Sequence, residues 1–496
     1  MRKKLAIVRG ANLNKWEMQN YEPLSDCFDI TAYTTAVHKY DTSHIKLSVM
    51  HLPGTGGGLL GQIEGLEDHL ADKEIIFSAD SSYLFSAQAI HSKIKHGNKV
   101  ICLQWENIPF NYDDHEMIFK IKKMVRENAD HFIAVTSRAK EALVLEGVPE
   151  EFIDVIPMGI DLNRFQPDDQ AMMSERKRLH ISTEEIVVLF IGRIVWEKGV
   201  YDLVHAASKI LRDRELKKFG IRFVLAGNGP ELKLLYERTA HLGIADSFLF
   251  LENYPYEEIH RLHNIADIFI LPSIPSPNWQ EQFGMVLIES MACRKPVVST
   301  LSGSIPEVVG DAGLLVQPND HVSLCEALKR LISDNELREE ISIKALHKAE
   351  REFDSRKTAE RFKRVFEKVL SRRTRGENIR ALYEKGLQCW EAGDNEKGFH
   401  LACSAFAEDP DNREMLDSLV AMGRELNKLE DVELRLRDYL CYHPANIETL
   451  LVLAETLLNM GKPAQAEEEL QKVFLFDSEN KHAIDLTKQI NSRLSI

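Results

Sequence analysis

The sequence predicts an α/β protein with two doubly wound parallel-sheet domains that face each other, followed by an all-α repeat array. Three observations support this. Residues 1–375 alternate short apolar, β-branched runs with amphipathic helical stretches, and the polar segment 166–185 divides these runs into two series. Residues 376–496 repeat with a fixed period and carry helical patterns only. A chain of 496 residues has room for about three such domains.

Eleven apolar runs are the predicted strands. They lack the alternation of a half-exposed strand, so we expect each to be buried on both faces, as in a parallel sheet. Helical stretches between them supply the crossovers. The first series comprises residues 4–10, 74–79, 99–105, 131–137 and 154–160, and the second comprises 185–194, 221–229, 247–254, 267–273, 295–300 and 312–318.

The domain boundaries follow from the two series. We expect a first domain over residues 1–175, a second over 176–353, and an amphipathic helix over 354–375 that crosses back onto the first domain. Ligands of such sheets bind beyond the carboxyl ends of the strands. Two facing sheets therefore place the ligand site in the crevice between them.

Residues 376–496 contain an internal repeat. The motifs DPDN, HPAN and DSEN start at Asp409, His443 and Asp477, each 34 residues after the previous one. A period of 34 with two helical patterns per unit is typical of tetratricopeptide repeats, here three units and a capping helix. From Glu377 to Ile496 there are 23 acidic and 13 basic residues, so this tail is much more acidic than the rest.

Composition excludes several classes. The net charge of −15 argues against a general nucleic-acid binder. No apolar run reaches about 18 residues, and the apolar stretch near the N-terminus is too short for a signal peptide. The seven cysteines are dispersed, which fits reduced thiols better than a disulfide framework or a zinc site. We expect a cytoplasmic protein, with a peripheral place at a membrane left open.

The first candidate site is GRIVWEKG, directly after a predicted strand. Arg193 and Lys198 lie five residues apart across a turn into a helix, so both can reach one point in the crevice. Two cations and helix N-terminal amides suit a diphosphate. Taken alone, the pair is equally compatible with two solvated charges.

The second candidate site is the segment WQEQFGMVLIES. Glu281 precedes a predicted helix and Glu289 lies nearly two turns inside it, so they can serve separate parts of one ligand. The exposed amides at that helix start add partial positive charge for an anion; they belong to Phe283, Gly284 and Met285. A capping role for one glutamate and a solvated helix face for the other are the alternatives.

These motifs, in this order, resemble the retaining family-4 glycosyltransferases of GT-B fold (glycosyl transferases group 1). The resemblance covers about residues 1–375 and includes VIPMGID, GRIVWEKG, AGNGP, ADIFILPS, the Glu281…Glu289 pair, PVVST and DAGLLVQP. It implies two facing Rossmann-like domains, with a nucleotide-diphosphate sugar on the second and the acceptor on the first.

The resemblance also implies roles for single residues. Arg193 and Lys198 hold the diphosphate, and Glu281, with the amides after it, binds hydroxyls of the transferred sugar. Glu289 binds the ribose hydroxyls. Weaker candidates are Asn253 and Tyr254 at the base and Gly10 in a turn facing the phosphates. No metal or other cofactor is required, and the catalytic set is Glu281, Arg193 and Lys198.

The acceptor side departs from the family pattern. Where family members often carry a histidine after the strand at 99–105, this chain has Trp105 and Glu106. These are candidates for stacking on a sugar and for hydrogen bonding to the acceptor, with a buried Trp and a surface Glu as equal alternatives. The acceptor is left open among a glycan, a lipid-linked sugar and a polypeptide.

The expected activity is a retaining, nucleotide-sugar-dependent hexosyltransferase. The alternatives are a nucleotide-sugar 2-epimerase, a phosphorylase-like enzyme, and an inactive transferase-fold scaffold that carries an adaptor. We expect the repeats to recruit a partner or acceptor, or to hold a dimer, with simple extension of the fold as the remaining alternative.

Overall fold

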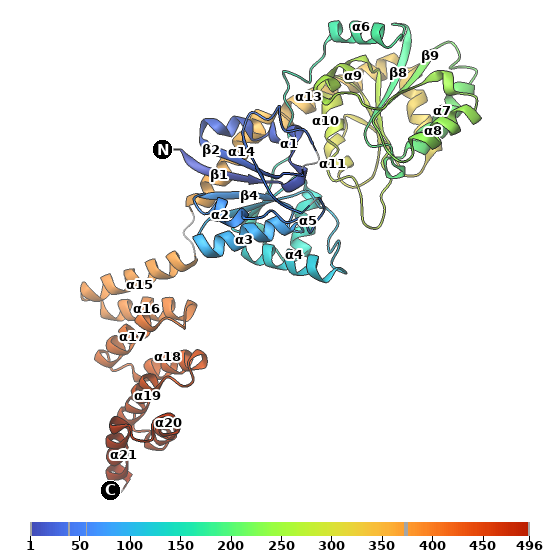
Figure 1. Cartoon of the computed structure of the whole chain (residues 1–496). Helices are drawn as coiled ribbons and strands as arrows, with labels where there is room; N and C mark the ends of the chain where they lie inside the picture. Colours follow the sequence, from blue (N-terminus) through green and yellow to red (C-terminus); the bar gives the residue numbers. More distant parts are fainter. Residues whose placement is uncertain (1, 38–39, 56, 372–374, 495–496) are drawn as a thin grey trace. The chain divides into compact units, whose positions relative to one another are not determined.

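The computed structural model describes residues 2–37, 40–55, 57–371 and 375–494. It divides into two compact units, Met1–Ser371 and Arg372–Ile496. The predicted end of the crossover helix at 375 falls beside residues 372–374, which lie outside the described residues. Figure 1 shows that the first unit contains both sheets and that the second is helical.

The first sheet has seven described strands, all parallel, in the order β3-β2-β1-β4-β5-β6-β7. Helices cover both faces (Figure 1). Alternate residues of β1 point to opposite faces, so Leu5 and Ile7 join one apolar cluster and Ala6 and Val8 another. The strands are β1 (Lys3–Val8), β2 (Phe28–Thr35), β3 (Ser48–Leu52), β4 (Ile75–Ala79), β5 (Lys99–Gln104), β6 (His131–Ala134) and β7 (Ile153–Val155).

The helices of this domain precede or follow its strands in chain order, and one returns from the end of the unit. The short 3₁₀ turn η1 (Gly10–Asn12) follows β1. The α-helices are α1 (Lys15–Met18), α2 (Leu66–Leu70), α3 (Leu84–His96), α4 (Glu116–Asn128), α5 (Ser137–Leu145) and the returning α14 (Ser355–Ser371).

The second sheet has six described strands, all parallel, in the order β10-β9-β8-β11-β12-β13. Its strands are β8 (Glu185–Ile191), β9 (Gly220–Ala226), β10 (Phe248–Leu251), β11 (Ile268–Leu271), β12 (Val297–Thr300) and β13 (Gly313–Val316). Its helices are α6 (Asp169–Arg178), α7 (Val200–Arg212), α8 (Leu232–His241), α9 (Ile259–Ile265), α10 (Met285–Ala292), α11 (Ile305–Val309), α12 (His321–Ser333) and α13 (Asn335–Glu352). Two parallel sheets with helices on their faces are the doubly wound architecture that the sequence predicted.

The chain passes between the two sheets twice, and the two passages lie side by side. The amide of Ile160 donates to the Phe353 carbonyl (2.8 Å), and the amide of Ser355 donates to the Ile160 carbonyl (3.0 Å). Helix α14 then returns to the first sheet, where Phe362 packs edge-on against Tyr21 and Phe77 at 5.2 and 5.6 Å. The return is therefore anchored by aromatic packing on the first domain.

Two features differ in detail from what the sequence predicts. Strands β2 and β3 were not among the predicted strands: β2 carries three threonines and alternates in burial, and β3 is a short edge strand. Helix α6 spans the predicted boundary at residue 175 and packs against α9 of the second sheet. Within the described residues, no helix is both long and apolar enough to span a bilayer.

Seven helices make up the described part of the second unit: α15 (Arg375–Glu391), α16 (Asn395–Glu408), α17 (Arg413–Glu425), α18 (Leu429–Tyr442), α19 (Ile447–Asn459), α20 (Pro463–Phe476) and α21 (Lys481–Leu494). The 34-residue period falls on their caps. The side-chain oxygens of Asn412, Asn446 and Asn480 each accept the backbone amide three residues later, at 3.0–3.2 Å.

The turns inside each repeat keep the same spacing. Gly393, Asn427 and Gly461 all have positive φ, at +86°, +56° and +73°. Asparagine is the non-glycine residue that tolerates this conformation best, which explains why the middle repeat can lack the glycine.

Candidate functional site

A pocket of about 460 Å³ opens at the carboxyl ends of strands β8, β9 and β10. Its second-sheet wall is formed by residues at the ends of these strands, by Tyr256 and Ile259, and by Met285, Val286 and Glu289 of α10. The first domain contributes Trp16 and Tyr40. The pocket therefore lies where doubly wound sheets bind their ligands, with a contribution from both domains.

A glycine contact shapes the floor of this pocket. Gly227 has φ +144°, and a Cβ built there would lie 1.9 Å from the carbonyl oxygen of Gly192. Any larger residue would push apart the two loops that follow β8 and β9. Gly227 thus keeps the backbone close to the space where a ligand binds.

Arg193 lines the pocket and its side chain is exposed. Among the residues that the structure describes, no carboxylate forms an ion pair with it. A guanidinium of this kind is free to form bidentate hydrogen bonds with a phosphate group.

Glu289 lies in the same pocket, on α10, and its side chain is only 2% exposed. The Tyr256 hydroxyl donates to its Oε1 (2.9 Å), and His263 Nε2 lies 3.3 Å from its Oε2. Burial, with Glu289 as the next contribution, raises the pKa of Tyr256 well above its usual value, so this phenol stays a donor. Each carboxylate oxygen still has a lone pair for a hydroxyl donor in the pocket.

Lys198 and Glu281 form an ion pair: Lys198 Nζ lies 2.7 Å from Glu281 Oε2, and the Ser273 hydroxyl donates to the same oxygen at 2.8 Å. Both side chains keep some exposure, 13% and 9%. The Lys198 ammonium also lies 4.9 Å from the centre of the Trp279 ring. Among the described residues, Glu281 Oε1 accepts no hydrogen bond. The structure therefore brings two predicted site residues together and leaves one oxygen available.

The three residues after Gln282 differ in their accessibility. Gly284 is the N-cap of α10, with φ +85°. Met285 lines the pocket, whereas the Phe283 ring is buried and packs edge-on against Trp105 at 6.3 Å. Phe283 can therefore offer a backbone amide, but its side chain serves packing.

Of the two residues predicted to contact the base, Asn253 and Tyr254, only Tyr254 lies at the pocket. Tyr254 lines the pocket, and its hydroxyl donates to Glu175 Oε1 at 2.8 Å. Asn253 is exposed and does not line the pocket. Tyr256, which the sequence reading did not select, lines the pocket beside Trp16 with ring centroids 5.4 Å apart.

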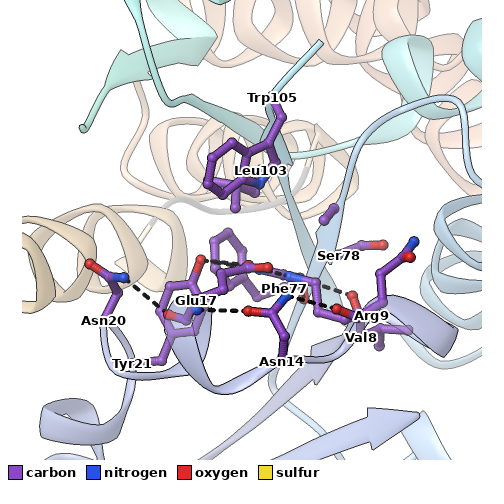
Figure 2. Close-up of polar contacts among 12 residues, drawn as sticks. Val8, Arg9, Asn14, Glu17, Asn20, Tyr21, Phe77, Ser78, Leu103 and Trp105 are labelled. Atoms are coloured by element: carbon purple, nitrogen blue, oxygen red, sulfur yellow. Dashed lines mark hydrogen bonds and ion pairs between the residues drawn. The ribbon is translucent and has the colours of Figure 1, made fainter. Parts of the chain in front are cut away.

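Gly10 is buried under the ring of Phe85 and does not line the pocket. Arg9, just before it, is turned away into the core (Figure 2), where its Nε lies 2.6 Å from Glu17 Oε1. The first-domain wall is formed by Trp16 and Tyr40, whose rings meet edge-on at 4.6 Å. An unexplained tryptophan shortly after the first strand was the available sequence signal for this wall.

On the predicted acceptor side, Glu106 is directed toward its own loop. Its Oε1 accepts the amides of Asn107 and Ile108, and its Oε2 accepts from Asn111. Burial raises its pKa. The amides of Trp105 and Glu106 both donate to Asp80 Oδ1, at 2.7 and 3.1 Å. Glu106 thus shapes the loop, and Trp105 keeps partial exposure next to Phe283.

Asp80 directly follows β4 and was not selected from the sequence. It has φ +43°, an uncommon conformation for a non-glycine residue. Burial raises its pKa to about 7, against the effect of the two amides that donate to it. Two backbone amides from the next loop hold it in place, which couples the ends of β4 and β5.

Comparisons with known proteins show what this chain is similar to. Residues 172–348 match the family model described as "Glycosyl transferases group 1". The matched segment contains Arg193, Lys198, Glu281 and Glu289. The chain is 31% identical over 231 residues to D-inositol 3-phosphate glycosyltransferase of Nocardia farcinica, covering 45% of this chain and 50% of that protein. Over 262 residues it is 31% identical to the enzyme of the same name from Thermobispora bispora, covering 51% and 59%.

The chain therefore spans about half the length of the curated relatives it matches. The first unit also resembles solved structures. Anabaena HepE in complex with UDP superposes with a TM-score of 0.62 at 18% identity, covering 74% of this chain and all of that one. Sucrose-phosphate synthase of Thermosynechococcus elongatus superposes with a TM-score of 0.59 at 19% identity, covering 75% of this chain and all of that one. The fold is thus the two-domain GT-B arrangement, and the match to the glycosyl transferases group 1 model lies in its second domain.

Proposed function

We propose that this protein is a glycosyltransferase that moves a hexose from a nucleotide-diphosphate sugar to an acceptor. The observation that carries the proposal is the pocket beyond β8 and β9, whose wall holds a buried, hydrogen-bonded Glu289 and an Arg193 that has no ion-pair partner among the described residues. A diphosphate needs fixed cations, and a ribose diol needs a fixed acceptor. The match of this segment to the family model supports the same reading.

The Lys198–Glu281 pair is assigned to the reacting end of the donor. The ammonium neutralises charge that builds on the leaving diphosphate, and the free Oε1 of Glu281 accepts a sugar hydroxyl. The amides at the start of α10 add partial positive charge. Arg193 and Lys198 supply the charge that a metal ion supplies in other transferases, so we propose a metal-independent reaction.

Retention of configuration is part of the proposal. It requires the acceptor oxygen to approach from the face that the diphosphate leaves. We assign the proton of the acceptor hydroxyl to the leaving phosphate oxygen, as the glycosidic bond to the donor breaks and the bond to the acceptor forms. The contribution of the protein is orientation and electrostatic stabilisation.

We assign the helical unit to the tetratricopeptide class and propose that it recruits a protein partner, an acceptor or a second copy. The 34-residue spacing of the capping asparagines and of the positive-φ turns supports that class. We also propose a cytoplasmic place of action.

Calorimetric titration of the full chain with UDP, GDP and ADP tests the donor site. UDP comes first because the solved neighbour binds it. We expect tight binding of one diphosphate, lost in the Arg193→Ala/Lys198→Ala double variant and kept in Arg214→Ala, an exposed arginine outside the pocket. No binding of any diphosphate would favour the non-catalytic scaffold.

A product assay then separates the remaining activities. The donor found by titration is supplied with a panel of acceptors that includes inositol 3-phosphate, glycans, lipid-linked sugars and peptides, with and without chelator. NMR of the product reports its anomeric configuration. An inverted product would refute retention, loss of transfer with chelator would refute the metal-free reaction, and an epimerised donor would favour the 2-epimerase.

A further inference from the structure

A second cluster of ligand-type side chains lies outside the pocket, where α7 packs against α12. Asp202 and His205 are three residues apart on α7, so they lie on one face of that helix. His321 is the first residue of α12. One ligand atom from each of the three lies within 4.8 Å of the other two. None of these three side chains lines the donor pocket.

Asp202 has a buried side chain without a hydrogen-bond donor among the described residues. The residue is only 8% exposed, yet among the described residues no group donates a hydrogen bond to its carboxylate. Buried carboxylates in native proteins are normally hydrogen-bonded or bound to a cation.

The two histidines are suited to be ligands. Their rings meet edge-on with centroids 5.6 Å apart, and both side chains keep partial exposure, which leaves an entry path. Each ring offers a nitrogen lone pair in its neutral form, which is the form that binds a metal ion.

We propose that Asp202, His205 and His321 form a site for a divalent transition metal of the zinc class that ties α7 to α12. Two imidazoles and a carboxylate are a ligand set that suits zinc, with a water molecule to complete a tetrahedron. Zinc bonds of about 2.0–2.1 Å place ligand atoms about 3.4 Å apart, so the three side chains would close in from the 4.8 Å within which their ligand atoms now lie.

The surrounding charges and contacts allow this role. The groups that face the cluster are Asp320, which caps α12, and Arg238 from α8, so one further carboxylate offsets one cation. At the other end of the same helix pair, Lys329 of α12 already lies 2.8 Å from Asp213, just after α7. The metal would link the N-terminal ends of α7 and α12, next to Gly199 and Lys198. This places it outside the reaction itself.

Metal-free full-length protein is titrated with Zn²⁺ against a chromophoric chelator. We expect one zinc equivalent in the wild type, with affinity at least about 100-fold lower in His205→Gln, His321→Gln and Asp202→Asn, because each removes a direct ligand. His241→Gln, an exposed histidine on α8, is the matched control and is expected to bind as the wild type does.

Two further measurements keep the result specific. Co²⁺ bound at this site is expected to show ligand-field bands of a tetrahedral nitrogen–oxygen site without a thiolate charge-transfer band. Thermal unfolding without metal is expected to be alike in all variants, which shows that they fold. Equal zinc affinity in the wild type and the three variants, or a thiolate band, would overturn the proposal. Both readouts are independent of any transferase activity.

Discussion

The two α/β domains each contain a carboxylate–cation pair with little exposure, and the two pairs differ in what they leave for a ligand. In the first domain the Arg9 guanidinium donates to Glu17, to the carbonyls of Val8 and Phe77, and to the Tyr21 hydroxyl (Figure 2). In the second domain, among the described residues, the Lys198 ammonium donates only to Glu281.

The difference shows how ion pairs of similar composition acquire different roles. Arg9 has the Phe77 ring 4.7 Å from its guanidinium carbon and is 2% exposed, and four of its five N–H groups already donate within the domain, so an incoming molecule does not reach it. Lys198 has two further N–H groups and partial access to solvent. We infer that the Arg9–Glu17 pair stabilises the first domain and that the Lys198–Glu281 pair binds the ligand. Each of the following predictions tests these assignments or the features around them.

The largest expected effect is on stability, from Glu17→Ala. Removing one partner leaves a buried, unpaired guanidinium, so we expect the free energy of unfolding of the first unit to fall by about 3–5 kcal/mol. Urea denaturation of the full chain, followed by circular dichroism, measures it. The matched control is Arg9→Met/Glu17→Leu, which removes both charges and is expected to recover most of the loss. A loss below about 1 kcal/mol in Glu17→Ala would contradict a structural role.

The second effect is on transfer, from Glu281→Gln. The amide keeps the shape but removes the charge that pairs with Lys198 and accepts the sugar hydroxyl. We expect kcat to fall about 10²–10³-fold, the scale of losing one preorganised electrostatic contact. Nucleotide binding and the urea midpoint are expected to stay nearly unchanged. Initial rates with the identified donor measure the loss, with exposed Glu257→Gln as the control. Wild-type turnover would remove Glu281 from the sugar site.

The third effect is on binding, from Arg193→Ala. Charge-assisted hydrogen bonds contribute about 1.5–3 kcal/mol, so the Kd for the nucleoside diphosphate should rise about 10–100-fold. The Kd of the free nucleoside should not change, because it has no phosphate. Calorimetry of both ligands gives the ratio, and Arg214→Ala is the control. Equal weakening of nucleoside and diphosphate would place Arg193 away from the phosphates.

The smallest effect concerns Asp80, a carboxylate that is buried with no ion-pair partner among the described residues. Burial raises its pKa to about 7 from the unfolded value of 3.8, so the native state holds a proton that the unfolded state releases. Stability from this group is therefore full below pH 3.8 and is lost as the pH rises through 7. Between pH 6 and 7 we expect a loss of about 1 kcal/mol.

Urea denaturation at pH 6 and at pH 7 measures this loss. Asp80→Asn keeps the size of the side chain but cannot titrate, and it is expected to remove the pH dependence. If the free energy of unfolding changes equally between pH 6 and 7 in the wild type and the variant, Asp80 is ionised throughout this range.

Much of the fold could be predicted because its signals are local. Runs such as 185–194 are apolar without alternation, and only a strand buried on both faces satisfies that pattern. Strands β2 and β3 were not predicted because neither carries such a local signal: β2 mixes threonines with apolar residues, and β3 lies at the sheet edge. Their pairing with β1 depends on neighbours far away in the chain.

Some of the candidate site residues could likewise be predicted from local motifs, and others could not. Arg193, Lys198, Glu281 and Glu289 stand out from the sequence because short motifs surround them, and the structure places two of them in the pocket and pairs the other two. Asn253 and Gly10 were nominated by their position in a motif alone. The exposure of the first and the burial of the second are set by neighbouring loops. A motif specifies residue type and order, not the direction in which each side chain points.

The sequence by itself determined the fold class, the order of the modules, the 34-residue period and the charged residues proposed for the donor. These depend on periodicity and on spacing within a few turns. Tertiary structure alone decided which cation is sealed and which is open, that Trp16 and Tyr40 close the pocket, and that His321 meets Asp202 and His205. Those outcomes depend on contacts between residues of different strands, helices and loops, whose geometry exists only once the sheets and helices have packed.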